Sequence, residues 1–266
     1  MMIQIKPVGG YYKSDANGFL RNNTTAVLQK NYVAPVTELI DIYRSHYDNI
    51  QSIYLRGSVA SGTAVAFISD IDMFAILKQG KSETYVRWLT VPFQQKIATS
   101  FLAKYPFING LDLAFTHYIP KVHLIDKKLN ILLKLHSKCV YGIDYSKDIS
   151  PIPLSSELYF NQRWFPDDLA IFLDFSFSIE NPQNKIREIL KVTIRVFFEL
   201  VMLRAQKYTQ SLYYCVESFK KYYPEKSEEA EQCLFWFLNP PKDITTVQKF
   251  LAIFGKWMLH QINTNE

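Results

Sequence analysis

Hydrophobic and polar positions along the first third of the chain switch between the helical and the strand period. In PVTELIDIYRSHY, from Pro35 to Tyr47, apolar residues recur at helical spacing, which predicts a helix that ends near Asp48. The runs SIYLRG and DIDMFAIL are rich in β-branched and aromatic residues and predict two strands. The small residues between them, VASGTAVAF, predict a single helical turn.

The pattern continues with one more helix and two more apolar runs. The segment from Glu83 to Lys104 predicts a helix that Pro92 kinks or splits. The runs GLDLAFTHYI and NILLKLHSKCVYG both predict strands. An order of strand, strand, helix, strand, strand indicates an α+β fold, with a mixed β-sheet and flanking helices.

The period changes beyond Pro151 and Pro153, where helical spacing dominates as far as Ile262. Breaks at ENPQN, YYPEKS and NPPKD separate the helices, so this half is predicted to be an all-α helical bundle. We therefore expect two domains, residues 1–152 and residues 153–266. Residues 1–30 have weak periodicity and predict an N-terminal arm of the first domain.

Composition narrows the class of protein only slightly. The chain has 266 residues, of which 48% are hydrophobic, enough for a substantial core. Its 30 basic and 25 acidic residues suit a polyanionic ligand such as a nucleotide, but form no dense basic tract typical of a dedicated nucleic-acid binder. Three cysteines without C-x-x-C spacing indicate neither disulfides nor zinc, and the absence of a long apolar run predicts a cytoplasmic protein with no membrane partner.

Three aspartates occupy positions that strands normally avoid. Asp70 and Asp72 open the strand DIDMFAIL, and alternation places them on one face, close enough to share a divalent cation such as Mg²⁺. Asp112, in GLDLAF, supplies a third carboxylate from a second strand. The alternatives are a turn-and-cap pair for Asp70 and Asp72, and a turn aspartate after Asn-Gly for Asp112.

A Gly-Ser pair closes the strand that precedes these carboxylates. Gly57 allows close approach of the backbone, and its N–H groups with the Ser58 hydroxyl could hold triphosphate oxygens. The spacing in GSVASGTA is that of a P-loop, but Thr63 stands where the lysine would be. The main positive charge of a P-loop is therefore missing.

In these motifs, RGS, eleven residues, DID and then LDL, the chain resembles the nucleotidyltransferase superfamily of DNA polymerase β type over residues 36–150. The helical half resembles the second domain of bacterial antibiotic-modifying members. The resemblance implies an enzyme that transfers a nucleoside monophosphate, most often AMP from ATP, to a hydroxyl group with release of pyrophosphate. It also implies two Mg²⁺ or Mn²⁺ ions on Asp70, Asp72 and Asp112, with the triphosphate on Gly57 and Ser58.

The helical half offers two further candidates for nucleotide binding. Arg187, Lys191 and Arg195 form a basic stripe on a predicted helix. Lys191 could neutralise the distal phosphates in place of the P-loop lysine that this chain lacks. The alternative is a solvated helix face. Tyr208 could contact the nucleotide, or else belong to the helical core.

The sequence leaves the acceptor open between a small molecule, RNA and a protein, and does not define the oligomeric state. A rival interpretation is a non-catalytic nucleotide sensor or antitoxin-like module on the same fold. The complete set of three aspartates argues against this rival, because a sensor has no need for all of them.

Overall fold

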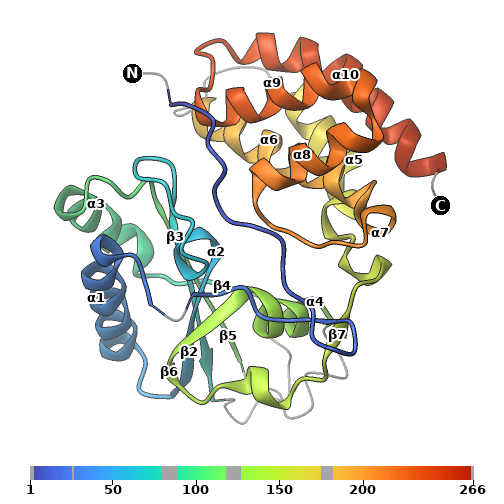
Figure 1. Cartoon of the computed structure of the whole chain (residues 1–266). Coiled ribbons are helices and arrows are strands. Elements are labelled where there is room, and N and C mark those ends of the chain that lie inside the picture. The colour runs from blue at the N-terminus through green and yellow to red at the C-terminus, as the bar shows by residue number, and fades with distance from the viewer. Residues whose placement is uncertain (1–2, 26, 79–88, 118–126, 175–181, 265–266) are drawn as a thin grey trace. The chain divides into compact units, whose positions relative to one another are not determined.

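The computed structural model describes residues 3–25, 27–78, 89–117, 127–174 and 182–264 (Figure 1). The chain divides into two units, which we call the sheet unit, Lys13–Pro153, and the helical unit, Met1–Tyr12 with Leu154–Glu266. The expected α+β class, a sheet domain followed by an all-helical region, is confirmed. No helix in the described part of the chain is long and apolar enough to cross a membrane.

The sheet unit is built on a mixed five-stranded sheet with the order β4-β5-β3-β2-β6. Its strands are β2 (Ile50–Arg56), β3 (Ile71–Leu77), β4 (Leu89–Thr90), β5 (Leu111–His117) and β6 (Ser137–Gly142). Strands β3 and β5 are parallel, and the other neighbours are antiparallel. Two short strands, β1 (Phe19–Leu20) and β7 (Ile152–Pro153), pair separately near the two ends of the unit.

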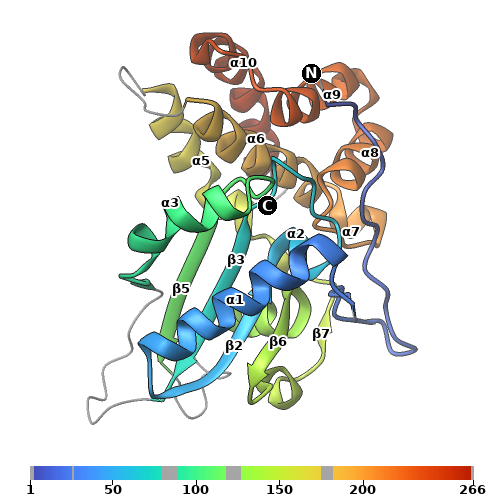
Figure 2. The ribbon, with the colours of Figure 1, turned by 90° about the vertical axis from the view of Figure 1, so that its left-hand side faces the viewer.

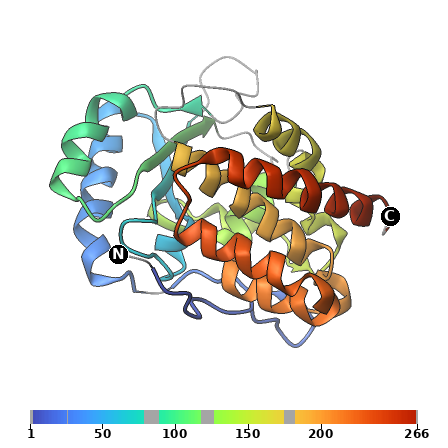
Figure 3. The ribbon, with the colours of Figure 1, turned by 90° about the horizontal axis from the view of Figure 1, so that it is seen from above.

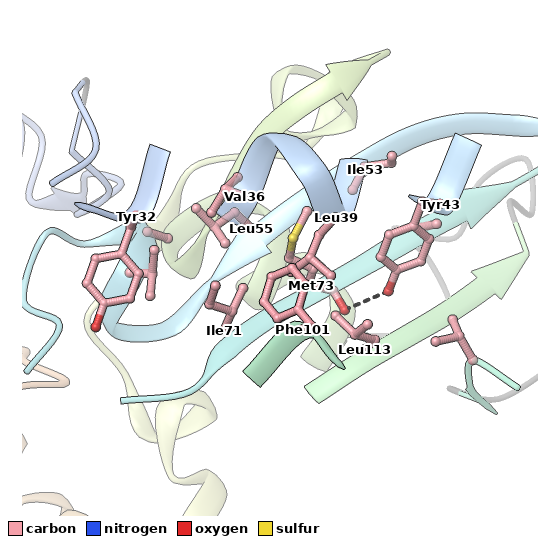
Figure 4. Packing of buried hydrophobic residues seen from close by; sticks show 14 of the residues in the cluster. Tyr32, Val36, Leu39, Tyr43, Ile53, Leu55, Ile71, Met73, Phe101 and Leu113 are labelled. Atoms are coloured by element: carbon pink, nitrogen blue, oxygen red, sulfur yellow. Dashed lines mark hydrogen bonds between the residues drawn. The ribbon is translucent and has the colours of Figure 1, made fainter. Parts of the chain in front are cut away.

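Helices cover both faces of this sheet. Helices α1 (Lys30–His46) and α3 (Gln94–Lys104) lie over one face (Figure 2). That face buries Ile71, Met73 and Leu113 against α1 side chains such as Leu39 (Figure 4). The other face buries Tyr54, Phe74 and Ile76 against α4 (Lys127–Ile131) and the π-helical turn Leu132–His136. Alternate strand residues therefore belong to different cores, as the strand period requires.

Two segments differ from the sequence prediction. The predicted helix from Glu83 begins outside the described residues, and Leu89–Thr90 forms a strand before α3 starts at Gln94, beyond Pro92. The run NILLKLHSKCVYG was predicted as one strand, but its first half belongs to α4 and the π-helical turn, and β6 begins only at Ser137. Leu129 and Leu133, spaced four residues apart, both bury against the sheet. A short apolar run does not show from its sequence whether it follows the helical or the strand period, so the helical turns were missed.

Tyr43 fastens α1 to the backbone of two strands. Its single hydroxyl proton is shared between the Met73 carbonyl oxygen of β3 at 3.2 Å (Figure 4) and the Ala114 carbonyl oxygen of β5 at 2.9 Å. The ring is fully buried, and burial raises the pKa of the hydroxyl.

We expect Tyr43→Phe to lower the free energy of unfolding by about 1 kcal/mol, because both carbonyls lose a buried donor. Urea denaturation measures the change. Tyr141→Phe, on a partly exposed ring in β6, is the control and should change stability little. Equal effects of the two substitutions would contradict a structural role for the Tyr43 hydroxyl.

The helical unit is organised around one central helix (Figure 3). Helix α6 (Pro182–Glu199) contacts α5 (Phe160–Leu173), α8 (Leu212–Tyr222), α9 (Ser227–Leu238) and α10 (Ile244–Thr264). The short helix α7 (Met202–Ala205) and single 3-10 turns at Ser156–Leu158 and Pro224–Lys226 complete the unit. Nine of the 18 residues of α6 are buried, and seven of these nine are apolar, which explains its central place.

The first residues of the chain pack with this helical unit. The Asn239 side chain pairs with the Ile3 backbone at 2.6 and 2.8 Å, and the Tyr12 N–H donates to the Tyr208 carbonyl at 2.8 Å. Thr209 Oγ1 donates to the Gly10 carbonyl at 2.8 Å. The prediction that the whole arm belongs to the first domain is therefore wrong for residues 3–12. Weak periodicity marked an irregular segment but could not show where it packs.

A buried carboxylate holds the start of α5. The Glu199 side chain, 4% exposed, accepts from the backbone N–H groups of Asn161 at 3.0 Å and Gln162 at 2.8 Å. Burial is the main cause of a pKa above the ordinary value of 4.5. Because the pKa of Glu199 is higher in the folded than in the unfolded state, its protonation stabilises the fold below pH 4.5. This stabilisation is lost as the pH rises through the raised folded-state pKa.

Glu199→Gln should lower the free energy of unfolding by about 1–3 kcal/mol, because the new amide turns a donor toward a backbone N–H. The difference from the unchanged protein should be larger at pH 4.5 than at pH 8, since the protonated carboxyl is the favoured form. Urea denaturation at both pH values tests this, with Glu188→Gln, an exposed residue of the same helix, as the control. A loss of stability that grows with pH would contradict the raised pKa.

Candidate active site

Three charged residues stand in one row across the ends of three neighbouring strands. In the register of the sheet, Arg56 of β2 lies opposite Asp72 of β3, and Asp72 lies beside Asp112 of β5. Residues in register on adjacent strands project to the same face. Tyr54 lies two residues before Arg56 and Phe74 lies two residues after Asp72, and both pack against α4. Since side chains two residues apart on a strand share a face, the row lies on the sheet face that α4 covers.

Within the row, one guanidinium group bridges two carboxylates. Arg56 Nη2 donates a hydrogen bond to Asp112 Oδ2 and lies 3.8 Å from Asp72 Oδ1. The side chains are 30% exposed for Arg56, 22% for Asp72 and 53% for Asp112, so the group lies at the surface and is open to a ligand. Arg56 Nε is buried and has no hydrogen-bond partner among the described residues.

Asp70 lies just before β3 and has a different set of neighbours. Asn109 Nδ2 donates to Asp70 Oδ1 at 2.9 Å, and a Cβ atom at Gly110 would lie 3.1 Å from the same oxygen. The Tyr32 hydroxyl is buried and unpaired within the described structure; burial and the charge of Asp70 both raise its pKa. Asn109 and Gly110 thus hold Asp70 from the turn before β5, a role that sequence reasoning missed.

Gly57 has two structural reasons to be glycine. It has φ +71° at the start of the short helix α2 (Gly57–Ala60), directly after β2. A Cβ atom there would overlap with Asp72 Oδ2. We predicted that close approach at Gly57 would serve a triphosphate; in the structure it already serves the Asp72 carboxylate. Ser58 follows in α2, so the helical turn predicted for residues 59–67 begins earlier, at Gly57, and ends at Ala60.

The donor set fits a divalent cation. No group of three or more His, Cys, Asp or Glu side chains forms a ready metal centre in the part of the chain that the structure describes. Asp72 and Asp112 nevertheless share one cation already, the Arg56 guanidinium. Carboxylate oxygens on adjacent strands are the ligands that Mg²⁺ and Mn²⁺ prefer, and Asp70 is two residues away along the chain.

The two candidates in the helical unit have different surroundings. Lys191 lies on α6, and the side chains of its basic stripe are half-buried and not fully solvated. One member, Arg187, donates from Nε to the Phe237 carbonyl at 3.3 Å. Tyr208 is 2% exposed, and its hydroxyl accepts from Gln210 Nε2 at 2.7 Å. These are the surroundings of a core tyrosine, so we no longer propose that Tyr208 binds the nucleotide.

Residues 36–138 match the family model of the nucleotidyltransferase domain, and this range contains the whole charged row with Gly57 and Ser58. This part of the sheet unit is therefore similar to nucleotidyltransferase domains, in agreement with the resemblance in sequence.

Ten solved chains match the structure. One of them is the crystal structure of spectinomycin adenyltransferase AAD(9) from Enterococcus faecialis with ATP and spectinomycin. The match has a TM-score of 0.54 at 14% sequence identity and covers 86% of this chain and 98% of the other. At that identity the likeness shows a shared fold. No curated protein matches the chain in sequence.

Proposed function

We propose that this protein is a metal-dependent nucleotidyltransferase that moves a nucleoside monophosphate from a nucleoside triphosphate to a hydroxyl acceptor, and we expect the group transferred to be AMP. The observation that carries the proposal is the row of Arg56, Asp72 and Asp112 beside Gly57, within a domain of this family. In the reaction the acceptor oxygen forms a bond to the α-phosphorus. The bond from that phosphorus to the bridging oxygen breaks, and pyrophosphate leaves.

Asp70, Asp72 and Asp112 would hold Mg²⁺ or Mn²⁺. A bound divalent cation supplies charge neutralisation at the phosphoryl group and makes the acceptor hydroxyl easier to deprotonate. Asp112 is the most exposed carboxylate of the row, which suits a group that accepts the proton of an incoming hydroxyl. The N–H groups near Gly57 and the Ser58 hydroxyl would hold triphosphate oxygens, and Lys191 remains our candidate for the distal phosphates.

The test is transfer of a label from the α-phosphate. The protein is incubated with each α-³²P-labelled nucleoside triphosphate, Mg²⁺ and three acceptor pools: aminocyclitols including spectinomycin, cellular RNA, and cellular protein. The first pool is included because the similar structure contains ATP and spectinomycin. We expect label from ATP in one pool, with an equal amount of pyrophosphate.

One control and one contradicting result define the outcome. ATP labelled at the γ-phosphate should place its label in pyrophosphate and in none of the acceptors. Nucleotide binding without label transfer to any pool would contradict the enzyme assignment and favour the nucleotide sensor.

A further inference from the structure

We propose, on the basis of the function proposed above, that Arg56 is a cation that changes partners within the site. In the structure its guanidinium bridges Asp72 and Asp112. When a metal and a nucleotide bind, the guanidinium leaves these carboxylates and pairs with the triphosphate. The proposal concerns a residue that the family motif of Gly-Ser and three carboxylates does not include.

The first step of the argument is competition for the same oxygen atoms. The Arg56 guanidinium donates to Asp112 Oδ2 and approaches Asp72 Oδ1 at 3.8 Å, so it neutralises the two carboxylates from one position. A divalent cation bound to these oxygens would lie beside a permanent positive charge, because arginine does not deprotonate. Metal binding therefore requires the guanidinium to move, and metal without nucleotide should bind weakly.

The second step is the destination of the displaced guanidinium. Arg56 directly precedes Gly57 and Ser58, which we assign to the triphosphate. Its Nε has no hydrogen-bond partner in the described structure, so the group has an unused donor. Guanidinium donors match phosphate oxygens in pairs, and Thr63 stands where a P-loop would supply lysine. The triphosphate needs a cation at this place, and Arg56 can provide it.

A consequence is that metal and nucleotide favour each other's binding. The nucleotide gives the guanidinium a new anionic partner, which frees the carboxylates for metal. By thermodynamic linkage the metal then increases the affinity for nucleotide by the same factor. The free protein keeps its carboxylates neutralised until both ligands are present.

Arg56→Gln tests both steps at once, by titration calorimetry with Mn²⁺ alone and with a non-hydrolysable ATP analogue at saturating Mg²⁺. We expect Mn²⁺ to bind about tenfold more tightly, from the loss of a competing charge pair. We expect the analogue to bind about tenfold more weakly, from the loss of a charge-assisted contact. Arg44→Gln, which removes an exposed arginine 3.6 Å from Asp41 on α1, should change neither constant.

Each other result overturns the proposal. Weaker binding of both ligands would mean that Arg56 only supports the local structure. Unchanged dissociation constants for both ligands would mean that Arg56 has no role in binding either of them. Tighter Mn²⁺ binding with unchanged nucleotide affinity would exclude the triphosphate as its partner. If label transfer by the unchanged protein is intact, these results leave the proposed function standing; absence of nucleotide binding by the unchanged protein removes both.

If Arg56→Gln does not fold, the proposal can be tested by a measurement on the unchanged protein. The Nε–H resonance of Arg56, assigned from its loss in Arg56→Lys, is followed by ¹⁵N NMR. We expect this resonance to shift when Mg²⁺ and the ATP analogue are added together, and to shift little with Mg²⁺ alone. A resonance that stays unchanged with both ligands would overturn the exchange of partners.

Discussion

Asp72→Asn is expected to reduce label transfer by about 10²–10³-fold or more while leaving the fold intact, as seen when one electrostatic stabiliser is removed from a reaction centre. The amide has the size of the carboxylate, so it can keep the place beside Gly57, but it removes a negative charge from the row. Titration of Mn²⁺ in the presence of the ATP analogue should show the matching loss of metal affinity.

Asp41→Asn is the matched control, because Asp41 is an exposed acid of α1 near Arg44. It should transfer label at the rate of the unchanged protein. Thermal unfolding of both variants separates loss of the site from loss of the fold. Full metal binding by Asp72→Asn, and equally by the double variant with Asp70→Asn, would refute the assignment of these carboxylates.

Gly57→Ala is expected to damage stability and ligand binding together. A non-glycine residue at φ +71° costs about 1–2 kcal/mol in backbone conformation alone. The new methyl group would also overlap with Asp72 Oδ2, so the carboxylate must leave its place beside Arg56. We expect the free energy of unfolding to fall by more than the backbone cost, and binding of metal with nucleotide to be lost.

Gly18→Ala separates the two causes. Gly18 has φ +81°, but a Cβ atom there meets nothing within 4 Å, so this variant suffers only the backbone cost. In an Asp72→Ala background the overlap disappears, since the remaining Asp72 Cβ would lie 3.7 Å from the new methyl. There Gly57→Ala should cost about as much as Gly18→Ala. An unchanged cost in that background would show that the carboxylate is not the conflicting group.

Local patterns predicted much of this fold. The α1 helix, strands β2 and β3, the turn of α2 and the helical second half all follow from periodicity and residue type. The pairing of Asp72 with Asp112 agrees with an expectation that rested on two strands being neighbours. That expectation was testable only in a structure, because sequence does not give strand order.

The part that failed depends on contacts distant in sequence. Arg56 gave no local sign of its role, since its partner Asp112 is 56 positions away. Residues 127–136 form helical turns because the sheet face needs an apolar cover, which the run itself does not reveal. Tyr208 has the same residue type whether it binds a nucleotide or fills a core, and only its burial decides.

The packing of residues 3–12 with the helical unit has a consequence for biosynthesis. That unit is made from both ends of the chain, and the sheet unit is a continuous insertion whose own ends meet in the pairing of β1 with β7. On the ribosome the insertion is complete when Pro153 has emerged, while Ile3 must wait for Asn239. The sheet unit is therefore expected to fold first, and residues 3–12 have no partners until the residues of the helical unit that they contact have been synthesised.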